Sequence, residues 1–214
     1  AQAADAAGDG AADPCAEFRY STRLNMTTSY GKLNYNYDYD RRSLTLLGQK
    51  YGLVEPGMHA SGLSLFGIDW SVSLNTVARV GAGDTICVLP TSLDVFIGFR
   101  EPTIYIDNGL KKAGCRYNLV LRHEHQHQQV SIAALEYFMP RIRAEIQKAL
   151  PVVRPRAVAS LSATDAATEE MNGEYIRLIR PLVNDFKATL LYEQKKLDNR
   201  ENYRFESGVC KGRP

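Results

Sequence analysis

The hydrophobic pattern of this chain changes its period near Cys115, and this change restricts the fold more than any other feature of the sequence. Between about residues 19 and 106, large apolar side chains alternate with polar ones, which is typical of strands that bury one face. Gly and Pro residues separate these runs, as expected for turns. The clearest runs are Ile68, Trp70, Val72 and Leu74, and then Val95, Ile97 and Phe99. We therefore expect the first half of the chain to form an antiparallel sheet.

Beyond Cys115 the apolar residues recur every three or four positions, which is the period of an amphipathic helix. One helix is expected over about residues 118–149 and a second over about residues 162–199. Two long helices joined by a short linker should fold back on each other as an antiparallel hairpin. The predicted fold class is therefore α+β, with a flexible leader over residues 1–14 and a single domain over residues 15–214.

The composition excludes several classes of protein. Hydrophobic residues make up 44% of the chain and charged residues 23%, which is typical of a folded globular protein and not of a disordered one. The formal net charge of +2 gives no reason to expect a nucleic-acid partner. The apolar runs are shorter than the roughly 18 residues that suggest a membrane span. The sequence thus predicts a soluble protein with neither a membrane span nor a nucleic-acid partner.

The N-terminal residues and the cysteines together indicate export. The sequence begins with small residues and without an initiator Met, as a mature chain does after a signal peptide is removed. Four cysteines without a CxxC pair favour two disulfides in an exported protein. Of the three pairings allowed, we expect Cys15–Cys210, which would tie the termini together, and Cys87–Cys115, which would pin a strand to the first helix. The protein is expected to be secreted or periplasmic.

Residues 123–127 read HEHQH and contain the motif HExxH, whose chemistry requires a helix. At about 100° per residue, His123 and His127 lie one turn apart on one face, so both imidazoles can reach one zinc ion. Glu124 lies beside this position, where its carboxylate can take a proton from a water that zinc has acidified. His125 points away and is not expected to be a ligand. The apolar residues that follow share the face of His123 and His127, so the motif should face the interior.

Three other interpretations of HEHQH are open. The segment could be a solvated polar helix start that binds no metal. It could instead form a strand, in which His123, His125 and His127 would share one face. A third interpretation is a metal site without catalytic activity.

A catalytic zinc site usually has three protein ligands and an open position, so the third ligand must come from another part of the chain. Glu193 is the preferred residue, because it falls on the apolar seam of the second helix and, in a hairpin, lies level with His123. Glu201 and Tyr203 are alternatives to it. Asp198 is a candidate for holding one of the imidazoles from behind.

A resemblance adds to these observations. An HExxH helix followed by a long downstream helix resembles the zincin metallopeptidases. Tyr105–Asp107, Gly114–Tyr117 and the motif after them are similar to a bacterial family described as predicted secreted zinc-dependent proteases of unknown function, over about half of the chain. By this resemblance, the outer histidines of the motif would be zinc ligands and Glu124 the general base. The chain departs from the family near its end, where only Asp198 matches the Tyr-Asp, Thr and His-Gly pattern of the relatives.

The expected function is that of a secreted zinc metallopeptidase that hydrolyses amide bonds in a protein or peptide substrate. Zn²⁺ would be held by His123, His127 and Glu193, and Glu124 would act as general base. The rival expectation is a non-catalytic envelope or interaction protein that uses the same residues to bind a metal ion.

Overall fold

The longest strand, β5 (Ile86–Phe99), is the centre of the first of two sheets. In the computed structural model, β4 (Ile68–Val80) runs antiparallel to β5 on one side. β1 (Arg23–Ser29) runs parallel to the second half of β5 on the other side. On that same side, β7 (Arg156–Val158) pairs antiparallel with the first residues of β5. Strands flank both edges of β5, and most of its side chains are buried, those of Leu93, Val95, Ile97 and Phe99 in a core shared with α2 and α3.

A second, smaller sheet contains three short strands in the order β2-β6-β3. β6 (Thr103–Ile106) is the central strand, β2 (Asn34–Asn36) runs parallel to it and β3 (Gly62–Leu65) runs antiparallel to it. β3 is therefore an edge strand, and within the described residues 13–211 no strand pairs with its second edge.

The prediction of an α+β fold is confirmed, but the sheet is not purely antiparallel as predicted. Both sheets are mixed, since β1 and β2 each run parallel to a neighbour. Alternation by two residues reports which face of a strand is buried and carries no information on the direction of its neighbours. The long chain segment between β1 and β5 supplies the crossover that a parallel pair requires.

Helices make up most of the second half of the chain. The two predicted long helices are present as α2 and α3, and the shorter α1 and α4 were not predicted. Side chains cap both short helices: Asp40 accepts a hydrogen bond from Ser43 N, and Asn199 accepts one from Asn202 N. In chain order the helices are α1 (Arg41–Lys50), η1 (Ala82–Asp84), α2 (Cys115–Ala149), η2 (Leu150–Val152), η3 (Leu161–Ala163), α3 (Thr164–Leu197) and α4 (Arg200–Val209).

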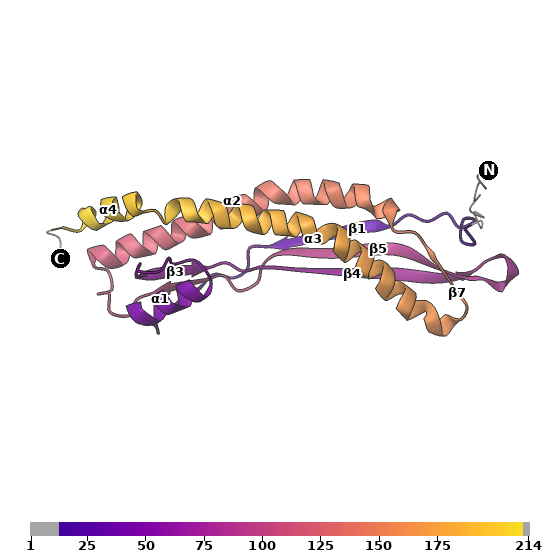
Figure 1. The fold of residues 1–214 in the computed structure, drawn as a ribbon, viewed down its shortest axis with the longest axis horizontal. Helices are drawn as coiled ribbons and strands as arrows, with labels where there is room; N and C mark the ends of the chain where they lie inside the picture. Colours follow the sequence, from indigo (N-terminus) through magenta and orange to yellow (C-terminus); the bar gives the residue numbers. More distant parts are fainter. Residues whose placement is uncertain (1–12, 212–214) are drawn as a thin grey trace, which may run out of the picture.

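The main core lies where α2 and α3 pack on the first sheet. α3 crosses the sheet obliquely, and its second half then runs beside α2 in the opposite direction (Figure 1). Every third or fourth residue of each helix is buried in this core. On α2 these residues are Leu135, Phe138, Ile142 and Ile146. On α3 they are Ala167, Met171, Tyr175, Ile179, Val183, Phe186 and Leu190.

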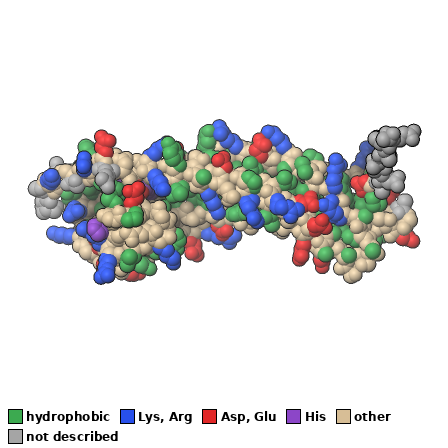
Figure 2. Space-filling view, viewed as in Figure 1, with side chains coloured by type: hydrophobic (Ala, Val, Ile, Leu, Met, Phe, Trp, Pro, Cys, Tyr) green, Lys and Arg blue, Asp and Glu red, His purple; other side chains and the backbone are tan. Residues whose placement is uncertain are grey.

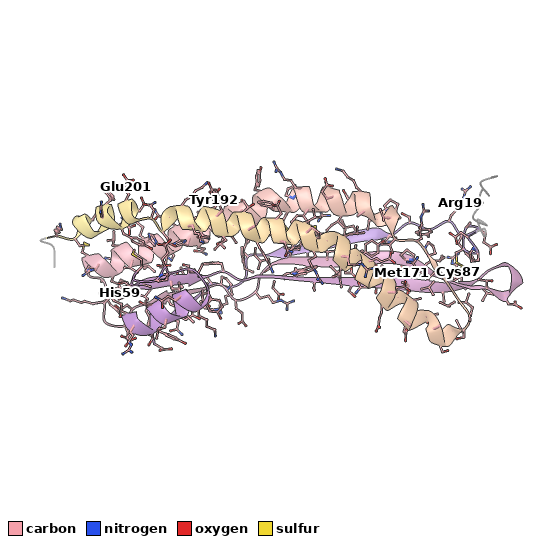
Figure 3. All side chains as sticks on the ribbon, viewed as in Figure 1. Arg19, His59, Cys87, Met171, Tyr192 and Glu201 are labelled. Carbon is pink, nitrogen blue, oxygen red and sulfur yellow. A yellow bond between two sulfur atoms is a disulfide. The ribbon has the colours of Figure 1, made fainter. Side chains whose placement is uncertain are left out.

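The predicted disulfide pairing is wrong. Cys15 is bonded to Cys87 and Cys115 to Cys210, so neither expected bond exists. The prediction assumed that the two ends of the chain meet, whereas the molecule is elongated. Arg19 and Cys87 lie at one end of it and Glu201 at the other (Figure 3). Each disulfide therefore fastens one end of the molecule.

The leader predicted for residues 1–14 lies almost wholly outside the described residues. Within residues 13–211, no helix is long and apolar enough to cross a membrane.

Candidate metal centre

The first half of α2 carries the HExxH motif on a buried face. His123, Glu124 and His127 are all buried, with 4–7% of each residue exposed. The two histidines are one helical turn apart, and their ring centroids are 4.8 Å apart. The helical interpretation of HEHQH is thus the one that the structure adopts.

Asp198, the C-cap residue of α3, completes the cluster. Its Oδ1 lies 3.1 Å from Nε2 of His123 and 3.1 Å from Nε2 of His127. The two Nε2 atoms are themselves 3.1 Å apart. Three atoms that all prefer a positive partner therefore form a nearly equilateral triangle.

The dimensions of this triangle fit a small divalent ion. Ligand atoms about 2.0–2.1 Å from a tetrahedral cation lie about 3.3 Å from one another. The 3.1 Å separations observed here need little adjustment to reach that spacing. Two imidazole nitrogens and one carboxylate oxygen form a donor set that suits Zn²⁺.

The outer nitrogens of both rings face oxygen acceptors. Nδ1 of His123 lies 3.2 Å from Oε1 of Glu206, and Nδ1 of His127 faces Oε1 of Gln194. The orientation of the Gln194 side-chain amide is fixed, because its Nε2 donates to the His127 carbonyl oxygen at 2.9 Å and to Ser131 Oγ at 2.7 Å. In a neutral ring the proton therefore lies on Nδ1, and Nε2 presents its lone pair to the centre. Two lone pairs and a carboxylate converge there, an arrangement that favours a cation or bound protons at the centre.

Without a metal ion, protons supply this charge. Burial alone would lower the pKa of His123, but the hydrogen bond with Asp198 and the charges of nearby carboxylates outweigh it and raise that pKa to about 9. The pKa of His127 is raised in the same way, against the effect of burial. For Asp198, burial is outweighed by hydrogen bonds from both histidines, which hold the pKa of its carboxyl well below the usual range.

α4 brings two further side chains to the cluster, Glu206 and Tyr203. The Tyr203 hydroxyl donates to Oδ1 of Asp198 at 2.6 Å, and its ring lies 5.6 Å from that of His123. Burial and the neighbouring Asp198 carboxylate raise the pKa of Tyr203, so the hydroxyl keeps its proton. The disulfide between Cys115 and Cys210 fastens the end of α4 to the start of α2, which holds both side chains in place.

Glu124 sits between the cluster and β3. Its Oε2 accepts a hydrogen bond of 2.8 Å from Ser64 Oγ. A Cβ on Gly62 would lie 2.4 Å from Oε1 of Glu124, so only glycine lets the strand approach so closely. Burial raises the pKa of the Glu124 carboxyl, although the nearby histidines oppose the effect. A raised pKa suits a group that must accept and return a proton near neutral pH.

The cluster lines a cavity of about 1150 Å³. α2, α3 and α4 form one side of this cavity, and β3 with the loop between α1 and β3 forms the other. Figure 2 shows Lys and Arg spread along the visible face of the molecule, with Asp and Glu between them. The cavity is large enough for a segment of several amino acids.

The structure brings together three of the four predicted site residues, and Glu193 is not among them. The Glu193 carboxylate pairs with Lys196 at 2.7 Å, and 40% of its side chain is exposed. Asp198 was expected only to hold one imidazole from behind. It instead occupies the third position of the cluster, which was predicted for Glu193. The inward face of α3 continues from the buried Leu190 to the half-buried Gln194 and to the C-cap Asp198 in steps of four, whereas the prediction took a step of three. A helix allows either step, so the sequence could not decide between them.

The remaining predicted residues lie apart from the triangle. His125 faces the other way, and its Nε2 lies 2.8 Å from the Tyr35 hydroxyl. Among the alternatives for the third ligand, Tyr203 adjoins the triangle through Asp198, whereas Glu201 is exposed on α4. Neither Glu206 nor Gln194 was singled out from the sequence, because nothing in their neighbourhood forms a recognisable motif.

Comparisons of this chain with family models, with curated proteins and with solved structures find no match. The geometry of the cavity and its residues therefore carries the assignment of function.

Proposed function

We propose that this protein is an exported zinc-dependent peptidase. The observation that carries the proposal is the meeting of His123, His127 and Asp198 at one point in a cavity, with Glu124 buried beside them. Two imidazoles and one carboxylate, with a position left towards the cavity, make up the usual ligand set of a catalytic zinc ion. A bound zinc ion supplies Lewis acidity, which polarises a carbonyl group and acidifies water.

The residues around the cluster then have separate tasks. Glu124 accepts a proton from water and returns it to the leaving amine, and Ser64 holds its carboxylate in position. Glu206 and Gln194 fix the rotation and the tautomer of the two imidazoles. The Tyr203 hydroxyl donates its one proton to Asp198, and it could donate to an oxygen that gains negative charge in the cavity only by leaving Asp198.

The free edge of β3 is where the substrate backbone would bind. β3 lines the cavity beside Glu124 and, in the part of the chain that the structure describes, pairs with β6 on one edge only. An extended peptide can add to such an edge through main-chain hydrogen bonds, which do not depend on its sequence. This supports a protein or peptide as the substrate.

The two disulfides support export to the periplasm or the exterior, because such bonds persist in oxidising compartments. A second candidate function is metal binding without catalysis. The observation that favours it is the position of the Tyr203 hydroxyl beside Asp198. A fourth protein ligand at this position would leave no open position for water or substrate.

Metal analysis and one variant separate these functions. Zinc measured after dialysis should be close to one ion per wild-type chain and absent from His123→Ala/His127→Ala. His125→Ala, from the same motif but outside the cluster, is the matched control and should keep its zinc. Glu124→Gln should keep zinc and lose hydrolysis of a casein or peptide-library substrate. Equal zinc in the double variant and the wild type would overturn the proposed centre, and zinc without any hydrolysis by wild type would favour the binding function.

A further inference from the structure

Three cationic side chains line the cavity without an acidic partner among the described residues. They are Arg116 on α2 and Lys187 and Lys195 on α3, and all three are exposed. Arg41 also lines the cavity, but it differs from these three because it pairs with Asp107 at 3.6 Å. A cation that faces a cavity without a partner is free to bind a negative group on a ligand.

The carboxylates of the cavity do not neutralise these cations. Asp198 and Glu206 are engaged by the histidines, and Glu124 is buried against β3. Within residues 13–211, Glu55, in the loop before β3, is the one lining carboxylate that makes no hydrogen bond or ion pair. The uncommitted charge of the walls is therefore mainly positive.

The three cations lie on both sides of the metal cluster. Lys195 is one helical turn before Asp198, and Lys187 lies about 16 Å from Asp198 along α3. Arg116 precedes His123 by about 10 Å along α2. Because α2 and α3 run in opposite directions, these two distances extend away from the cluster in opposite directions (Figure 1). An extended peptide rises about 3.3 Å per residue, so the cations span about eight residues of bound peptide.

We propose that the cavity selects an extended acidic peptide, held by Lys187 and Lys195 on one side of the cluster and by Arg116 on the other. This inference rests on the proposed peptidase function and names the substrate class of the same site. The β3 edge binds the backbone of any peptide, and the three cations supply the discrimination between acidic and basic sequences.

Peptide binding to the zinc-loaded Glu124→Gln protein tests the inference without requiring hydrolysis. The probes are three fluorescein-labelled peptides with the same central Ala-Leu-Phe-Ala segment and four flanking Glu, Gln or Lys residues on each side. By fluorescence anisotropy at low ionic strength, the Glu peptide should bind about tenfold more tightly than the Lys peptide. The difference should shrink in 0.5 M NaCl, because salt screens exposed charges.

Charge reversal locates the selectivity. Lys187→Glu/Lys195→Glu, made in the Glu124→Gln protein, should remove the preference for the Glu peptide. Arg177→Glu/Arg180→Glu is the matched control, since both arginines are exposed on α3 outside the cavity, and it should keep the preference. Equal affinity for the Glu and Lys peptides, or an equal loss in both double variants, would overturn the inference. A wild-type protein that hydrolyses no peptide would overturn the peptidase function alone, because the binding preference is measured separately.

Discussion

The helices α2 and α3 run through both ends of this molecule, but the interior of one end is apolar and that of the other is polar. At the end where α2 and α3 cover the first sheet, the buried residues are almost all apolar. At the end with the smaller sheet, α1 and α4, the interior holds polar groups. Among residues 13–211, the buried polar or charged side chains are Thr45, Asp107, His123, Glu124, His127 and Ser131. They all lie towards this second end.

One continuous stripe on each helix joins the two ends. On α2 the stripe passes from Ile142 and Leu135 to His127 and His123. On α3 it passes from Phe186 and Leu190 to Gln194 and Asp198. Since the helices are antiparallel, the polar parts of the stripes meet and the apolar parts meet. Each end has a disulfide, but only the polar end buries a cluster of ionisable groups that needs a cation or bound protons to balance its charge.

Removal of the disulfides should have the largest effects, and zinc binding should separate the two ends. Replacement of either pair by serines, Cys15→Ser/Cys87→Ser or Cys115→Ser/Cys210→Ser, should lower the free energy of unfolding by about 4–5 kcal/mol, because each bond closes a long loop. Only the second replacement should also weaken zinc binding, by about tenfold, since it releases α4 with Glu206. Urea denaturation and competition with a zinc chelator measure the two effects. A loss of zinc affinity in both variants would contradict the separation of the ends.

The pH should act on the polar end in two opposite ways. The folded-state pKa of His123 is raised to about 9, so its contribution to metal-free stability is complete below 6.5 and is lost as the pH rises through about 9. Zinc must displace this proton, so zinc affinity should rise about tenfold per pH unit over the same range. Chelator competition at pH 6 and pH 8 should show a change of about a hundredfold or more. A pH-independent affinity would mean that the histidines are not ligands.

Glu124 should lower the stability of the polar end. Because burial raises its pKa, the folded metal-free protein loses stability as the pH rises above the ordinary value of 4.5. Glu124→Gln should therefore increase the free energy of unfolding at pH 7 by about 1 kcal/mol and should have no effect near pH 4. Glu193→Gln, an exposed site, is the control and should change little. Urea denaturation with a chelator present at both pH values provides the measurement.

The smallest effect is expected at Ser64. Ser64→Ala removes the hydrogen bond to the Glu124 carboxylate and should cost about 1 kcal/mol of stability. Peptide hydrolysis should fall severalfold, while zinc content stays at the wild-type level because Ser64 does not touch the histidines. A loss of zinc in this variant would show that β3 supports the metal ligands and not the general base.

The apolar end was the easier one to predict from the sequence. The change of period near Cys115 gives the order of sheet and helices, because burial alone imposes it. Strand direction is set by crossovers that leave no local trace, so the parallel pairs of β1 and β2 were missed. The disulfides were mispaired because the pattern of elements does not report that the molecule is elongated.

At the polar end, the sequence correctly predicted only those site residues that lie close together along the chain. His123, Glu124 and His127 lie within five residues, and helical geometry alone places them together. Asp198 comes from 71 residues beyond His127, and its position depends on how two helices are aligned. If the inward face of α3 is moved by one residue, Gln194 replaces Glu193 on it and Asp198 replaces Leu197. Only tertiary packing selects the correct step.

The pairing of the four cysteines also bears on how the chain matures. Each cysteine is bonded to its neighbour in the sequence, so the loops closed by the two bonds neither overlap nor enclose one another. Cys15 and Cys87 can join before Cys115 has been synthesised or translocated. Oxidation in the order of synthesis would therefore yield the native connectivity without rearrangement of the bonds.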